Sequence, residues 1–260
     1  MGHIHLGVLP QSRKWREVVD LLDAGAIAED VIAASARAAE REMLDAARSP
    51  VVVEAVRLLL MVPHAARQDD FGLALRNLNL AVGSAPSLLE ILSASSEVLD
   101  ATGRDTRDNS DLGELAGRAL VATFSDQIGD ALPGLFAATP ADVQAVAQRL
   151  SWRNGIAVLS RAFFARLMAD TLSSWLDRTL SAQVGEGRRF ADAQSRNKFD
   201  QALAQYAQEA SAIIQEFSPG WYGKRLYEDG RISTTQAAAF TAVSFKKIVE
   251  ELKRKRVVHD

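Results

Sequence analysis

Residues 199–217 read FDQALAQYAQEASAIIQEF, which is the most regular apolar pattern in the chain. Six apolar side chains recur at alternating steps of four and three residues: Phe199, Leu203, Tyr206, Ala210, Ile213 and Phe217. This spacing places side chains on one face of an α-helix, and that face must pack against other elements. The stretch therefore predicts a long amphipathic helix, which Ser218-Pro219-Gly220 ends, in a fold built from helices.

Similar patterns and helix-start signals occur along the rest of the chain. A second long helix is expected from about Trp152 to Val184. Ser and Thr are favourable N-cap residues, Pro is tolerated in the first helical turn, and a Gln three residues after the cap completes a capping box. These signals mark the starts of four further helices: Ser12, Ser49-Pro50, Thr139-Pro140 and Ser233 with Gln236.

These patterns predict a predominantly all-α fold, a single domain over residues 1–260 with about eight to ten helices. Two short β-elements are expected beside them. Residues 3–9 alternate between polar and apolar, which is typical of a strand, and Asp229-Gly230 indicates a small hairpin near residues 226–232. The polar stretch 101–111, ATGRDTRDNSD, is expected to form a flexible surface loop.

The composition excludes several classes of protein and site. With 48% hydrophobic and 24% charged residues, the chain is typical of a soluble globular protein. The absence of Cys excludes disulfides and thiolate-bound metals. No apolar run reaches the about 18 residues of a membrane span, and the N-terminus lacks the features of a signal peptide. We therefore expect a cytoplasmic protein without membrane contact; its excess of Arg over Lys indicates a GC-rich, bacterial genome.

The charges are unevenly distributed along the chain. Residues 1–150 carry 13 basic and 21 acidic side chains, whereas residues 151–260 carry 17 basic and 12 acidic ones. An acidic half is thus followed by a basic half. The basic half either forms a surface for an acidic partner or pairs with the acidic half within one fold. We favour pairing within the fold.

Cations in the basic half lie close in sequence to aromatic residues, a combination that suits phosphate neutralisation and base stacking. The candidate nucleic-acid-binding residues are Arg188, Arg189, Lys224, Arg225, Lys246, Lys247, Lys253, Arg254, Lys255 and Arg256. The last helix also has a purely structural interpretation. Its Glu250–Arg254 and Glu251–Lys255 pairs stabilise a solvated helix end, and cations there complement the helix dipole.

Short motifs for metal or phosphate binding are weak. His3 and His5 share one face of the expected strand, but no spacing identifies further ligands. The segment 185–189, GEGRR, lacks the Lys-Ser/Thr of a P-loop and is expected to be a helix stop with exposed arginines. Asp126 and Asp130, four residues apart, could hold Mg²⁺, although pairing with arginines is commoner. We therefore expect no metal and no cofactor.

The aromatic residues divide into two groups. Trp15, Trp152 and Trp175 occur in helical patterns and are expected in the core or between helices. Trp221 and Tyr222 follow Pro-Gly in an expected loop, where an aromatic pair either fills the core or marks a partner surface.

No catalytic motif is present in the sequence. We expect a non-catalytic helical interaction or scaffold protein, a component of a multi-protein bacterial system that binds a protein partner or a second copy of itself. Two alternatives remain. One is nucleic-acid binding through the basic half, and the other is an enzyme whose site has no local motif.

Overall fold

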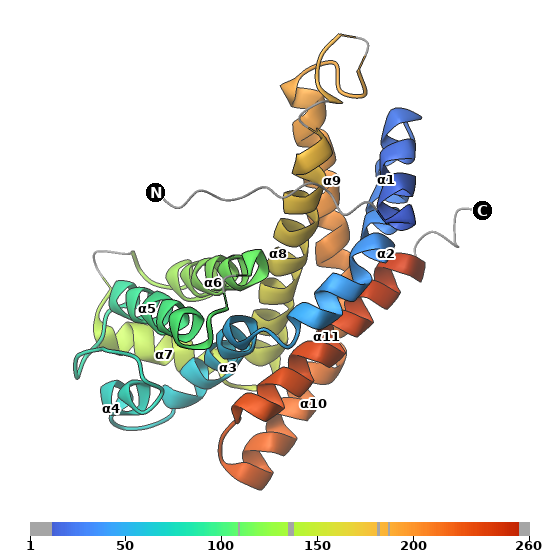
Figure 1. The fold of residues 1–260 in the computed structure, drawn as a ribbon. Coiled ribbons are helices and arrows are strands. Elements are labelled where there is room, and N and C mark those ends of the chain that lie inside the picture. Colours follow the sequence, from blue (N-terminus) through green and yellow to red (C-terminus); the bar gives the residue numbers. More distant parts are fainter. Residues whose placement is uncertain (1–11, 109, 135–137, 181–182, 187, 255–260) are drawn as a thin grey trace.

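A computed structural model describes residues 12–254, except residues 109, 135–137, 181–182 and 187. The described residues form eleven α-helices and one π-helical turn (Figure 1), so the prediction of an all-α fold is confirmed. In chain order the helices are α1 (Arg13–Asp23), α2 (Ala28–Ala46), α3 (Pro50–Ala65), α4 (Phe71–Arg76), α5 (Leu88–Thr106), α6 (Asp111–Phe124), the π-turn η1 (Ser125–Gly129), α7 (Pro140–Leu150), α8 (Arg153–Leu180), α9 (Ala193–Ala210), α10 (Ala212–Asp229) and α11 (Thr234–Arg254).

The 28-residue helix α8 forms the axis of the molecule. Helices α9 and α10 follow one another antiparallel to it, α9 along its C-terminal half and α10 along its N-terminal half (Figure 1). Two contacts fix this register. Arg196 of α9 forms an ion pair with Asp177 near the end of α8, and Arg161 near its start donates to Gln215 of α10 at 3.3 Å.

The stretch 199–217 is helical as predicted, but it is shared between α9 and α10, which meet at Ser211. The centre of its buried face is also displaced from the predicted stripe. Tyr206, Ile213 and Phe217 lie at the edge of the face and are only partly buried. The buried centre consists of Phe199, Leu203, Ala207, Ala210, Ile214, Ser218 and Tyr222.

The expected helix stop at residues 218–220 and the hairpin near residues 226–232 are both wrong. Helix α10 continues through Pro219 to Asp229, and Gly230 follows it in the left-handed conformation with φ +67°. Asp-Gly favours a hairpin turn, but a Gly with positive φ also ends helices. The expected strand at residues 3–9 lies outside the described residues, and the described part of the chain contains no strand, only an isolated bridge between Val184 and Phe190.

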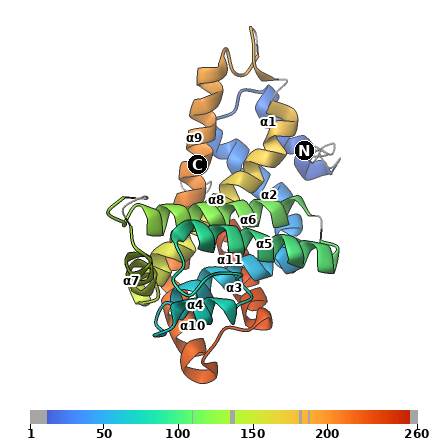
Figure 2. The same ribbon diagram turned by 90° about the vertical axis from the view of Figure 1, so that its left-hand side faces the viewer.

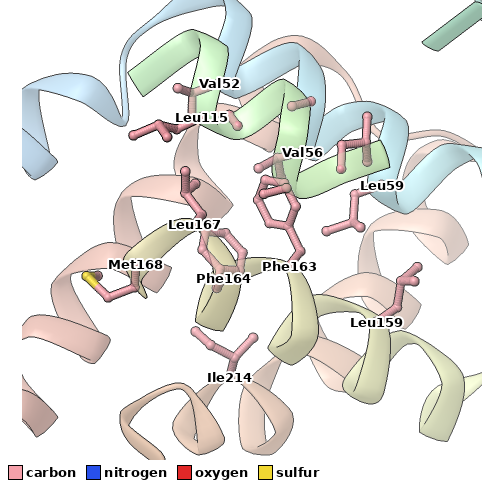
Figure 3. Packing of buried hydrophobic residues seen from close by; sticks show 14 of the residues in the cluster. Val52, Val56, Leu59, Leu115, Leu159, Phe163, Phe164, Leu167, Met168 and Ile214 are labelled. Atoms are coloured by element: carbon pink, nitrogen blue, oxygen red, sulfur yellow. The ribbon is translucent and has the colours of Figure 1, made fainter. Parts of the chain in front are cut away.

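Helix α3 is buried on nearly all sides because α5, α6, α7, α8 and α11 pack around it. This environment explains why the residues from Val51 to Val62 are all apolar except Glu54 and Arg57, a composition typical of a central helix. Figure 3 shows Val56 and Leu59 of α3 facing Phe163 and Phe164 of α8. The two phenylalanine rings meet edge to face at 5.1 Å, and their burial joins the α3 side of the molecule to α8.

The expected flexible loop at residues 101–111 is mostly helical. Helix α5 continues to Thr106, and α6 begins at Asp111; Figure 2 shows the two helices side by side on one face of the molecule. The short connection is anchored by Asp108, whose carboxylate accepts hydrogen bonds from the Ser49 hydroxyl and the Val51 N–H. The polar residues of this stretch lie largely on the exposed side of α5.

The predicted helix starts at Ser12, Ser49, Thr139 and Ser233 are confirmed. Ser49 caps α3 with Pro50 in its first turn, and Thr139 forms a full capping box with Asp142. Ser233 accepts from the Gln236 N–H at 3.2 Å, while the Gln236 side chain accepts from the Ser233 N–H at 2.8 Å. Within the described residues, none of the helices combines the length and apolarity that crossing a membrane requires.

Candidate functional site

The segment after α8 has a structural role through Arg189. Its guanidinium donates to the carbonyl oxygens of Leu21, Leu22 and Ala26, at 3.5, 3.4 and 2.5 Å. These carbonyls lie at the end of α1 and just beyond it, where backbone acceptors lack helical partners. Half-buried Arg189 therefore ties this segment to α1, and the expectation that both arginines are exposed is wrong for Arg189. Arg188 is exposed.

The other candidate cations are spread over two helices, and most contact residues of the same chain. On α10, Lys224 and Arg225 both pair with Glu228, at 3.8 and 3.0 Å. On α11, Lys247 lies 5.5 Å from the centre of the Phe217 ring. Lys246 is exposed and has no ion pair with a described residue.

At the end of α11, Lys253 pairs with Glu40 of α2 at 2.6 Å, and Arg254 pairs with Glu251 at 2.8 Å. Lys255 and Arg256 lie outside the described residues. Each of these pairs uses a cation that the sequence offered as a phosphate ligand, so the structure gives them a role within the fold.

Trp221 and Tyr222 lie inside α10 and not in a loop. The Trp221 ring packs on Phe240 of α11 with 4.7 Å between ring centres, and Tyr222 is buried against the core. The Tyr222 hydroxyl has no hydrogen-bond partner in the described chain, and burial raises the pKa of this phenol above its ordinary value. Both side chains thus contribute to packing between α10 and its neighbours.

One member of the acidic pair, Asp126, binds an arginine in the structure. Asp126, in the π-turn, accepts a hydrogen bond from Arg166 of α8 at 2.5 Å, and Asp130 follows the turn. Within the described residues, no group of three or more His, Asp or Glu side chains is arranged to hold a metal ion. The pair His3 and His5 lies outside the described residues.

The surface with the most distinctive geometry surrounds Trp152, between α7 and α8. The indole is 57% exposed, so of the two positions expected for Trp152, in the core or between helices, the core is wrong. The Arg67 guanidinium carbon lies 4.1 Å from the ring centre, which is the geometry of a cation–π contact. Arg67 in turn donates to the Ser151 hydroxyl at 2.7 Å and to the Ser151 carbonyl oxygen. Arg67, bound to Ser151, therefore fixes the position of the exposed ring.

Glycine makes this geometry possible. A Cβ placed on Gly155 would lie 2.4 Å from the Leu150 Cα, a distance that real side chains do not reach. Because Gly155 lets the start of α8 approach the end of α7 so closely, the chain turns within two residues, Ser151 and Trp152. Trp152 therefore lies at the junction between α7 and α8.

His64 adds a titratable group near Arg67. Its Nδ1 is buried and has no hydrogen-bond partner among the described residues. Burial lowers the pKa of His64, and the positive charge of Arg67 lowers it further, while a hydrogen bond with the Gly230 backbone acts in the opposite direction. Burial and the charge of Arg67, which supports Trp152, thus both lower the pKa of partly buried His64.

No family model, curated protein or solved structure matches this chain.

Proposed function

We propose that the protein is a non-catalytic helical interaction protein, a component of a multi-protein bacterial system, and that it binds a protein partner at Trp152. The observation that carries this proposal is the exposed indole stacked on Arg67. Trp and Arg are enriched among the residues that dominate protein interfaces. A ring that is already fixed loses little side-chain freedom on binding, which favours affinity.

The charges around Trp152 indicate the chemistry of the partner. Arg149 and Arg153 lie within three residues of Trp152 in the sequence, are exposed and form no ion pair with a described residue. A partner surface with an apolar pocket rimmed by carboxylates complements this arrangement.

Affinity purification from the native cells tests the proposal with wild type and three variants. Trp152→Ala removes the anchor, Arg153→Glu reverses a rim charge, and Tyr227→Ala removes another exposed aromatic ring, 92% exposed, as the matched control. At least one protein should be recovered with wild type and Tyr227→Ala, and lost with both other variants. When that protein and the chain are each purified, wild type and Tyr227→Ala should bind it in solution. Trp152→Ala and Arg153→Glu should not. Equal recovery with all four chains would contradict the proposal.

A further inference from the structure

A polar pocket of about 730 Å³ lies between α3, the segment after α4, α5 and the turn from α10 to α11. This volume falls in the range of pockets that bind small molecules. Charged and amide side chains line it: Glu54, Arg57, Asn79, Glu97, Asp105 and Arg231. These residues come from four separate parts of the chain, and no local motif unites them.

A buried ion pair on α3 belongs to the pocket lining. Arg57 donates from Nε and Nη2 to the two oxygens of Glu54, at 2.7 and 2.6 Å, and Nη2 also donates to the Leu78 carbonyl at 3.2 Å. The two side chains are only 14% and 12% exposed. Nη1 of Arg57 has no acceptor among the described residues, yet it is not among the atoms sealed from solvent. It remains a charged donor for a molecule in the pocket.

The other charges of the pocket are carboxylates on α5 and a cation in the turn before α11. Glu97 and Asp105 lie two turns apart on α5, and the same face carries the Thr102 hydroxyl. Arg231 comes from the turn before α11, beside Ser233 and Thr234 at the positive end of that helix dipole. Glu97, Asp105 and Arg231 are exposed and form no ion pair with a described residue. Their charges are therefore available to a ligand.

We infer that this pocket binds a small zwitterion of the amino-acid class, with its carboxylate toward Arg57 and Arg231 and its amine toward Glu97 and Asp105. The Glu54–Arg57 pair is neutral as a unit, so the remaining charges are one cation and two carboxylates. An anion alone would face those carboxylates, and a cation alone would face Arg231. A molecule with both charges satisfies both sides through charge-assisted hydrogen bonds. This site is separate from the Trp152 surface.

Thermal unfolding and calorimetric titration of the full chain with each proteinogenic L-amino acid test the inference. A ligand that binds only the folded protein raises its Tm. At least one amino acid should raise Tm and bind with one-to-one stoichiometry. Succinate, which lacks the amine, and putrescine, which lacks the carboxylate, should bind at least about tenfold more weakly.

Variants locate the binding. Arg231→Gln and Glu97→Gln should each weaken affinity at least about tenfold, because each removes one charge-assisted contact. Asp100→Asn is the matched control, since Asp100 is an exposed carboxylate on the same helix that lines the groove between α5 and α6 instead. Far-UV circular dichroism verifies that each variant is folded. Three results would overturn the inference: no amino acid raises Tm, succinate or putrescine binds as tightly, or Asp100→Asn weakens binding as much as the pocket variants.

Discussion

Arg67 connects the core of the protein to its surface. Its guanidinium holds Ser151, stacks beneath Trp152 and contributes to the lowered pKa of His64. A single guanidinium makes all of these interactions. We expect substitutions of Arg67 to affect the Trp152 surface as strongly as substitutions of Trp152 itself.

The lowered pKa of His64 makes stability depend on pH. The unfolded chain has the ordinary histidine pKa of about 6.5, so it binds more protons than the folded chain as the pH falls below that value. The free energy of unfolding should therefore decrease on acidification through this range. Urea unfolding between about pH 8 and about pH 5 should show a smaller decrease for His64→Gln than for wild type. Identical pH profiles would contradict this role of His64.

The Trp152 surface shows what single-residue patterns can and cannot predict. A Trp within a helical period is usually buried, and that pattern predicts a position in the core or between helices. The sequence contains no sign of the support from Arg67, because Arg67 and Ser151 are 84 residues apart and meet only when α3 and α7 pack. The predicted start of the second long helix at about Trp152 was the only available signal that this residue lies at a helix junction.

Helix α10 shows why local signals can mislead about an element. Ser-Pro-Gly and Asp-Gly both favour turns, and together they predicted a stop and a hairpin. The structure instead has one helix up to Asp229, which packs along α8 for much of its length. Tertiary contacts outweighed the local cost of Pro219. Helix starts were predicted better, because a capping side chain and its backbone partner are only three residues apart.

Pro219→Ala tests this interpretation of α10. Proline inside a helix lacks the N–H that would bond to the carbonyl four residues earlier, here that of Gln215. Because α10 is continuous, the variant should raise the free energy of unfolding by about 1–3 kcal/mol in urea titrations. An unchanged or lower free energy would indicate that the helix ends at Pro219, as the sequence pattern predicted.

Substitutions of the adjacent residues Ile213 and Ile214 test which face of α10 is buried. Ile214 is fully buried, whereas Ile213 lies at the edge of the face. Ile214→Asp places an unpaired charge in the core, which costs on the order of several kcal/mol, and Ile213→Asp should cost clearly less because its carboxylate can reach water. Denaturant titration compares the two variants directly. A larger loss for Ile213→Asp would restore the stripe predicted from residues 199–217.

Across the whole molecule, the charge asymmetry of the sequence is partly used within the fold. Two ion pairs among the described residues join the acidic and basic halves, Arg166 with Asp126 and Lys253 with Glu40. The other ion pairs among the described residues join residues within one half, for example Arg196 with Asp177 and Asp200. The apolar patterns and helix-start signals predicted the all-α class, and residue counts revealed the uneven charge. The sequence could not predict which charges pair, because that depends on how helices pack.

This pairing predicts weak affinity for nucleic acid. Filter binding of wild type to duplex and single strands should show no complex at about 50 mM salt, where phosphate contacts are strong. Replacing Lys253 and Arg254 with Gln should cost only a few tenths of a kcal/mol per pair in stability. Binding that weakens steeply with salt and is lost in the variant would instead support the nucleic-acid interpretation of the basic half.

Photo-crosslinking from position 152 tests the proposed function most directly. A photoreactive phenylalanine analogue replaces Trp152 in one chain and exposed Tyr227 in a control chain, and both are irradiated in the native cells. We predict a crosslink from position 152, absent from position 227, to an acidic segment of one different protein. Crosslinking only to nucleic acid, only to a second copy of the chain, or equally from both positions would contradict the proposal that Trp152 anchors a protein partner.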